Sequence, residues 1–162
     1  MNGSTESRAS DAFERPGRRE VVLNLGTARR MLPLVMGIVQ DVMSCRQRLR
    51  RLTPEQECLD WQRQKLAWPQ RRRRYQVREE LDVVEKALHQ AMTELDQLGV
   101  ALLDAEEGRV GLPTNVNNHL AFFSWKPGDD GLRFWHFAGE TNRRNIPATW
   151  KETGDIRLVS KF

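Results

Sequence analysis

Residues 77–99 read VREELDVVEKALHQAMTELDQLG, and this stretch decides the fold. Its apolar side chains recur every three or four residues, the spacing that places them on one face of an α-helix. They are Val77, Leu81, Val84, Leu88, Ala91, Leu95 and Leu98. Gly99 follows the last of them, and glycine is the residue type that most often ends a helix. The pattern predicts one long amphipathic helix that begins near Pro69 and ends at Leu98.

A second helix of comparable length is predicted before it, ending near Arg51. Asn24 stands where a helix N-cap is expected, ahead of apolar residues that keep the same three-four spacing. These residues are Leu32, Val35, Val39, Val42 and Leu49. Pro33 interrupts the pattern early, so we expect the first turns to be kinked. Two long helices with a short connection predict an antiparallel, coiled-coil-like hairpin.

The connection is predicted to contain a short helix of its own. The segment TPE at residues 53–55 is a typical helix start, with threonine as the cap and proline in the first turn, where its missing N–H costs nothing. Pro69 disfavours helical geometry at Trp68, so we expect this short helix to end near Ala67. The hairpin therefore spans residues 21–99, with the short helix at its tip.

After the hairpin, the helical spacing gives way to short apolar and aromatic runs that predict strands. The runs lie at residues 100–103, 120–125 and 132–137, with a last candidate at residues 156–159. The segment KPGDDG at residues 126–131 predicts a hairpin turn, because Gly and Asp tolerate the dihedral angles of a chain reversal. Residues 115–118 mark another loop. The predicted fold class is α+β: a long antiparallel helical hairpin, followed over residues 100–162 by a small antiparallel β-sheet packed on its base.

The composition is that of a polar, mildly basic chain. Of its 162 residues, 39% are hydrophobic and 30% are charged, with a formal net charge of +4. Residues 1–20 mix charges with Ser and Gly, so we expect a disordered tail rather than a signal peptide or a membrane anchor. No apolar run approaches the roughly 18 residues that span a bilayer, so no membrane contact is expected. Cys45 and Cys58 fit neither a metal site nor a disulfide framework, which favours a reducing cytoplasm.

Two groups of short motifs lie near the ends of the region described so far. The C-terminal group is FFSWKPG at residues 122–128, FWH at residues 134–136 and IP at residues 146–147. The N-terminal group is Leu23, Asn24, Ala28 and MLPL at residues 31–34. Together they resemble the bacterial family called domain of unknown function 2203, over about residues 21–147. The resemblance implies a charged helical hairpin between the motifs and a cytoplasmic location. It implies no activity, because none is established for that family.

The uneven distribution of charge is the sharpest chemical feature. Residues 46–78 hold eleven basic and three acidic residues, a local charge of +8, whereas residues 79–98 hold one Lys and six acids, a local charge of −5. In an antiparallel hairpin the basic part lies at the tip. The candidate phosphate contacts for RNA or DNA are Arg71, Arg72, Arg73, Arg74 and Arg78. The alternative is that these arginines point around the helix and form ion pairs with Glu79 and Glu80.

Two tryptophans stand in the same basic region. Trp61 and Trp68 are seven residues apart, which on one short helix places them on one face. Interleaved with arginines, they are candidates for stacking against nucleic acid bases or a partner. The alternative is that they pack the tip of the hairpin or seal a dimer.

A cluster of residues near the C-terminal end forms a candidate pocket: Trp135, His136, Glu140, Arg143 and Arg144. A histidine beside a carboxylate can act as an acid–base pair or bind a metal. A metal site needs three or four protein ligands, however, and nothing in the sequence makes His89 or His119 converge on this one. A structural histidine bonded to a backbone carbonyl is therefore favoured. No catalytic residue, metal ligand or cofactor is assigned.

The leading functional hypothesis is a non-enzymatic, cytoplasmic interaction or scaffold protein. Two helices alone are expected to leave the apolar face of residues 77–98 half covered, and a second copy or a protein partner would complete its burial. The association face would consist of Val77, Leu81, Val84, Leu88 and Leu95. The first alternative is a nucleic-acid or ribosome-associated protein that uses the basic tip. A less favoured alternative is a metal or small-ligand site at His136.

Overall fold

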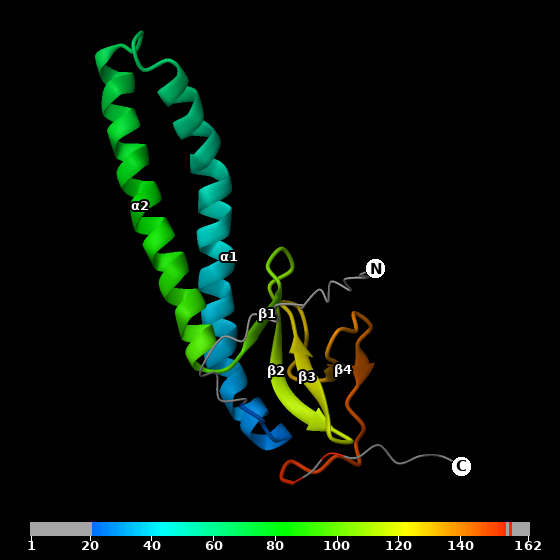
Figure 1. Ribbon diagram of the computed structural model, residues 1–162. Helices are drawn as coiled ribbons and strands as arrows, with labels where there is room; N and C mark the ends of the chain where they lie inside the picture. Colours follow the sequence, from blue (N-terminus) through cyan, green and yellow to red (C-terminus); the bar gives the residue numbers. More distant parts are fainter. Residues whose placement is uncertain (1–20, 155, 157–162) are drawn as a thin grey trace, which may run out of the picture.

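The protein folds into a helical arm and a small sheet, which confirms the predicted α+β class (Figure 1). The computed structural model describes residues 21–154 and residue 156. Two helices come first, α1 (Leu25–Trp61) and α2 (Trp68–Gln97). Five strands follow: β1 (Ala101–Asp104), β2 (Arg109–Val116), β3 (His119–Trp125), β4 (Phe134–Phe137) and β5 (Arg144–Asn145). The expected tail over residues 1–20 and most of the expected last strand, residues 157–159, lie outside the described residues.

The start of α1 is set by Asn24, as predicted. Its Oδ1 accepts a hydrogen bond of 2.8 Å from the backbone N–H of Thr27, one of the donors that a helix leaves unpaired in its first turn. Pro33 lies inside α1, and in Figure 1 the first, dark-blue turns of the helix lie at an angle to the rest, in agreement with a kink early in the helix.

The same helix continues through Pro54 to Trp61, so the separate short helix expected after Thr53 is wrong. A proline inside a helix removes one hydrogen bond, but it does not end the helix when packing holds both sides. Leu52, just before it, is buried. Glu55, just after it, accepts hydrogen bonds of 2.6 and 3.0 Å from Arg73 of α2. These contacts outweigh the local start signal.

The chain reverses over residues 62–67, where Leu66 is the buried side chain. The second helix then begins with Pro69 in its first turn. It ends where the sequence predicted. Gly99 follows the C-cap with a φ of 75°, and the N–H of Val100 donates to the carbonyl of Leu95 at 3.0 Å.

The apolar stripe of α2 is covered within a single chain. Its five predicted association residues are all buried or half-buried: Val77, Leu81, Val84, Leu88 and Leu95. Leu52 of α1 packs against the distal part of the stripe, and Leu95 belongs to the main core at the base. The expectation that this face would stand half covered is therefore not met, because α1 and the sheet already cover it.

The five strands form an antiparallel sheet in chain order from β1 to β5. The strand β2 was not expected, because Gly111 and Pro113 weaken the usual strand signal. Glycine is required at position 111, since a Cβ there would lie 2.8 Å from the ring of Phe122. Pro113 lacks a donor, but its carbonyl accepts a hydrogen bond of 2.8 Å from the N–H of Leu23. This bond ties the entry of α1 to the sheet.

The turns between strands follow the sequence more closely. Asn117 and Asn118 make the turn from β2 to β3, inside the loop expected there, with φ of 51° and 63°. Asn tolerates such dihedral angles better than most residues. Between β3 and β4, Asp129 Oδ2 accepts a hydrogen bond of 3.0 Å from the N–H of Lys126, which confirms the turn predicted for the KPGDDG segment. Ile156, where the last strand was expected to begin, forms an isolated bridge to β2.

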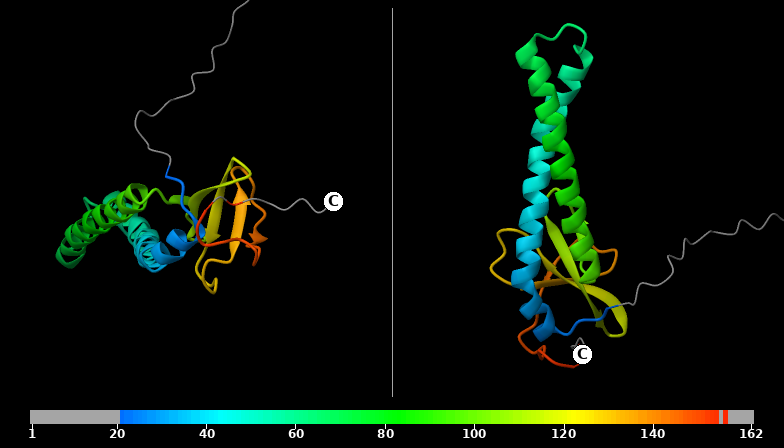
Figure 2. Two further views of the ribbon diagram at one scale, coloured as in Figure 1. Left: turned by 90° about the horizontal axis from the view of Figure 1, so that it is seen from below. Right: turned by 90° about the vertical axis from the view of Figure 1, so that its left-hand side faces the viewer.

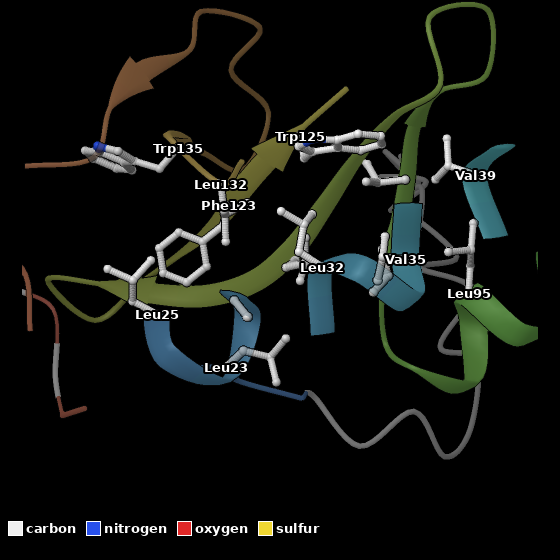
Figure 3. Close-up of a cluster of buried hydrophobic side chains, with 14 of the residues drawn as sticks. Leu23, Leu25, Leu32, Val35, Val39, Leu95, Phe123, Trp125, Leu132 and Trp135 are labelled. Carbon is white, nitrogen blue, oxygen red and sulfur yellow. The ribbon is translucent and has the colours of Figure 1, made fainter. Parts of the chain in front are cut away.

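The main core lies between the inner face of the sheet and the first half of α1 (Figure 3). Trp125 and Trp135 from the sheet and Leu32 and Val35 from α1 are buried there, and Leu95 of α2 joins them. Seen from below, α1 lies between α2 and the sheet (Figure 2). The distal half of the hairpin therefore projects as an arm with no sheet against it.

Candidate functional site

The tip of the arm consists of residues 62–67 and the adjoining helix ends, far from the sheet (Figures 1 and 2). Trp61 is the last residue of α1 and is 87% exposed. Trp68 is the first residue of α2 and is 73% exposed. The two tryptophans therefore do not share one helix, as had been expected. They flank the turn, because α1 runs on to Trp61 and the chain reverses before α2 begins.

The exposure of both indoles shows that neither packs the tip within a single chain. Tyr75, seven residues further along α2, is 60% exposed and adds a third aromatic ring near this end. Single exposed apolar residues are normal on a protein surface, but a group of large aromatic side chains at one extremity is a mark of a contact site. The tip is therefore a candidate binding surface.

Two members of the arginine run brace the tip. Arg73 donates to Glu55 at 2.6 and 3.0 Å and to Glu80 at 3.3 Å. Arg74 donates to Asp60 at 2.6 Å. The expected pairing within α2 is present in the Arg73–Glu80 contact, while Glu55 and Asp60 extend it across to α1. The phosphate-contact role predicted for these two arginines therefore competes with ion pairs that hold the two helices together.

The Glu55–Arg73 pair is charged at neutral pH. Hydrogen bonds from Arg73 lower the pKa of the Glu55 carboxyl below its ordinary value, against the opposing effect of burial. The same hydrogen bonds raise the pKa of Arg73. Because both side chains are only half-buried, water screens the pair, which fixes the geometry of the two helices and contributes little to overall stability.

The other three candidate phosphate contacts are oriented differently. Arg71 Nε donates to the carbonyl of Leu66 at 3.0 Å, so this side chain lies against the turn. Arg72 and Arg78 are exposed on α2, and neither forms an ion pair with another described residue. Of the five candidate phosphate contacts, these three have no carboxylate partner in the described part of the chain.

The turn adds two cations that sequence reasoning did not single out. Arg63 and Lys65 are exposed between the two tryptophans, and neither forms an ion pair within residues 21–154. The sequence alone does not place them at the tip, because it does not locate the turn at residues 62–67. We call the following set the tip surface: Trp61, Arg63, Lys65, Trp68 and Arg71. It combines two exposed indole rings with three positive charges.

The candidate pocket around His136 is filled by the fold itself. His136 is 3% exposed, and its Nδ1 lies 2.8 Å from the carbonyl oxygen of Phe137, the structural contact that the sequence analysis favoured. The ring of Phe122 lies 5.8 Å from the imidazole, centroid to centroid. Trp135 is buried on the other face of β4, because successive side chains of a strand alternate. The two neighbours therefore do not line one pocket.

The charged residues of that candidate pocket are held in separate contacts. Glu140 pairs with Arg144 at 2.8 Å, and the hydrogen bond from Arg144 lowers the pKa of the Glu140 carboxyl. Arg143 pairs with Asp129 of the β3–β4 loop, and its guanidinium lies 4.1 Å from the ring centroid of Phe134. These contacts tie the last loops to the sheet, and each of the three charged side chains has an ion-pair partner among the described residues.

A shallow hollow of about 390 Å³ adjoins this region and is lined by His119, Leu120, Phe137, Ala138 and Glu140. The ring of His119 packs edge-on against Phe137 with centroids 6.3 Å apart. Among the described residues, no three His, Cys, Asp or Glu side chains gather where they could hold a metal ion. In the same part of the chain, no helix combines the length and apolar character needed to cross a bilayer.

The fold and the tip define a class of protein in which a long helical hairpin projects from a small antiparallel sheet. A family model described as "Uncharacterized conserved protein (DUF2203)" matches residues 22–146. The match covers most of the chain, so the protein belongs to this family, as its end motifs had indicated. No curated protein and no solved structure matches the chain.

Proposed function

We propose that this protein is a non-enzymatic binding protein that holds single-stranded RNA or DNA at its tip surface. The observation that carries the proposal is the exposure of Trp61 and Trp68, 87% and 73%, on either side of a turn that presents Arg63 and Lys65. In this proposal the sheet anchors the base of α1, and the hairpin carries the binding surface away from it.

The chemistry of the tip surface suits unpaired nucleotides. An exposed indole is a flat ring on which a base stacks, and neighbouring cations neutralise the phosphates of the strand. In a duplex the bases are already stacked on one another, so a stacking surface favours single strands. Stacking requires no hydrogen-bonding groups at fixed positions, and the proposal therefore includes only a weak sequence preference.

The position of the exposed groups favours the tip over the helix seam. A scaffold that binds a partner through Val77, Val84 and their neighbours would need those residues in solvent, and both are fully buried in one chain. A ligand site at His136 has less support, because that side chain is 3% exposed and hydrogen-bonded to the backbone. The net charge of +8 over residues 46–78 points to a polyanion as the occupant of the tip.

The proposal is tested by titrating the protein with a labelled single-stranded oligonucleotide at two salt concentrations. For single strands, the logarithm of the association constant falls by roughly 0.7 for each contacted phosphate per tenfold increase in salt. The variant Arg63→Gln/Lys65→Gln is expected to bind more weakly, with a slope flatter by about 1.4. Both side chains are exposed and form no ion pair with another described residue, so the fold is expected to be unaffected.

A matched control removes the same charge from the base of the molecule. Arg29 and Arg133 are exposed, and they pair with Glu152 and Asp130. The variant Arg29→Gln/Arg133→Gln is expected to bind almost as the wild type does, because these groups lie well beyond the Debye length of about 10 Å from the tip. Equal losses in the two double variants, or wild-type binding that is absent or insensitive to salt, would contradict the proposal.

A further inference from the structure

A second surface lies along the arm, on the side of the hairpin that exposes Val83. Two hollows of about 500 and 350 Å³ lie between α1 and α2 there, and Arg48 borders both. Val83 lines the larger one and is 59% exposed, although it lies in the middle of a helix next to the buried Val84. We call this side, with Arg48, Gln76, Val83, Ala87, Gln90 and Glu94, the groove face.

Charge along α2 changes sign between Arg78 and Glu79, ahead of Val83, but the stripe through Val83 carries opposite charges at its two ends. Arg72 lies eleven residues before it and Glu94 eleven residues after it. Eleven residues are about three helical turns and about 16 Å, so the three side chains lie on one stripe with Val83 at its midpoint. Arg72 has no ion-pair partner among the described residues, and Glu94 is contacted by the neutral amide of Gln90 at 3.3 Å. Each end of the stripe therefore carries an uncompensated charge.

Such a stripe is complementary to itself when it is reversed. A two-fold axis through Val83 places Arg72 of one copy opposite Glu94 of the other, and symmetry repeats the pair on the far side of the axis. We propose that two copies of this chain associate through the groove face as antiparallel hairpins, with Val83 packed on Val83 and with two Arg72–Glu94 ion pairs.

The wider distribution of charge selects the same orientation. Residues 46–78 carry +8 and residues 79–98 carry −5. A parallel arrangement sets like charges beside one another, whereas the antiparallel one sets the basic half of each arm beside the acidic half of its partner. The second copy of this chain is thus an occupant whose charge fits the groove face.

The thin core of the arm supports the same association. In the described chain, the distal half of the hairpin buries Leu52, Val77 and Leu81 as a cluster separate from the main core. A second hairpin would cover Val83 and the hollows beside it and would turn a helix pair into a four-helix arrangement. The tip surfaces of the two copies would point in opposite directions and stay free, so this inference does not rest on the proposed function.

The association is tested by charge reversal and rescue, with the mass measured by sedimentation equilibrium over a range of concentrations at low salt. Arg72→Glu and Glu94→Arg each convert two attractive pairs into repulsive ones, and each is expected to weaken the dimer about tenfold or more. The combined variant Arg72→Glu/Glu94→Arg restores both pairs with opposite polarity and is expected to recover most of the affinity. Val83→Asp is expected to leave a monomer.

Matched controls lie on the opposite side of the same helix. Arg78→Glu and Glu85→Arg make the same changes of charge, but five residues before and two residues after Val83 the side chains point away from the groove face. Both variants are expected to dimerise as the wild type does. All the substituted side chains are exposed or half-buried, so each variant is expected to keep the helical fold, and circular dichroism verifies this.

A wild-type protein that stays monomeric at every concentration overturns the proposal. A combined variant as weak as the single variants also overturns it, as do controls that weaken the dimer equally. Oligonucleotide titration of Glu94→Arg and Val83→Asp, which change no candidate phosphate contact, separates this proposal from the previous one. Variants that lose the dimer and still bind the oligonucleotide support the dimer proposal and leave the proposed function of the tip surface intact.

Discussion

The two ends of the molecule use the same residue type in opposite ways. At the base, Trp125 and Trp135 are 4% and 1% exposed and fill the core between the sheet and α1. At the tip, Trp61 and Trp68 are 87% and 73% exposed. A buried tryptophan stabilises a fold, whereas one that stays in water contributes almost nothing to it. The tip tryptophans therefore need an explanation outside folding, and a binding role beside cationic groups supplies one.

The two ends also differ in what holds them together. The base is built around one broad apolar cluster that joins the sheet to both helices. The described distal half has the small Leu52–Val77–Leu81 cluster and the ion pairs of Arg73 and Arg74. Surface ion pairs contribute about 1 kcal/mol or less each. Stability is therefore concentrated at the base, and a core substitution is expected to cost less in the arm than at the base.

The largest expected effect separates a base tryptophan from a tip tryptophan. Trp135→Ala is expected to lower the free energy of unfolding by about 3–5 kcal/mol, because it leaves a cavity where the ring packs against Trp150, 5.0 Å away between centroids. Trp68→Ala is expected to change it by less than about 0.5 kcal/mol. Urea unfolding followed by circular dichroism measures both. A large loss in Trp68→Ala would remove the contrast between the two ends.

A smaller effect is expected in the core of the arm. Leu52→Ala is expected to cost about 2 kcal/mol, near the low end for such changes, because the small cluster borders solvent and can collapse around the gap. Leu112→Ala, in the broad core at the base, is expected to cost about 4 kcal/mol. The same urea titrations compare the two variants. Equal costs would contradict the view that the arm has the thinner core.

An ion pair at the base is expected to matter more than its exposed neighbour. The side chains of Arg143 and Asp129 are 14% and 10% exposed, so Asp129→Asn leaves a mostly buried cation unpaired beside Phe134, at a cost of about 1–2 kcal/mol. Asp130→Asn is the control, because that side chain is 92% exposed. Thermal unfolding midpoints measure both. A larger loss in the control would refute the assignment of this pair as structural.

The smallest effect is expected in the pH dependence of stability, through the Glu55–Arg73 ion pair near the tip. The pKa of Glu55 is lowered in the folded chain, so its contribution to stability is present above the unfolded pKa and is lost as the pH falls through the folded one. The wild type is therefore expected to be slightly more stable than Glu55→Gln at neutral pH, and this difference is expected to disappear as the pH falls through the folded pKa, which lies below the ordinary value for Glu. Melting curves at several pH values measure it. A difference in stability that persists unchanged in acid would contradict a stabilising role of the Glu55–Arg73 ion pair.

The features predictable from the sequence depend on neighbours along the chain. The stripe that contains Val77 and Val84 predicted burial, because a helix with such spacing hides its apolar side only against another element. The cap at Asn24 and the stop at Gly99 are also local, since each acts on the backbone within a few residues of itself. The hairpin, its two ends and three of the strands followed from such signals.

The features that could not be predicted depend on distant contacts. The start signal at Pro54 was overruled by the burial of Leu52 and by Arg73, which reaches Glu55 from the other helix. From the sequence alone, Gly111 is expected to interrupt a strand. In the fold it lies within one, because the ring of Phe122 occupies the space that a Cβ at this position would need. For the site, the exposure of the tryptophans depended on where the chain reverses, and the position of that turn followed from the same contacts between helices.

The central claim is that the tip tryptophans bind unpaired bases. It is tested most directly by measuring the affinity of the wild type and of Trp61→Ala/Trp68→Ala for a single-stranded oligonucleotide and for the duplex of the same sequence, at one salt concentration. The wild type is predicted to prefer the single strand. The variant, with every charge intact, is predicted to bind the single strand about tenfold or more weakly and the duplex almost unchanged. A variant that keeps the wild-type affinity for the single strand, at unchanged stability, would contradict the claim.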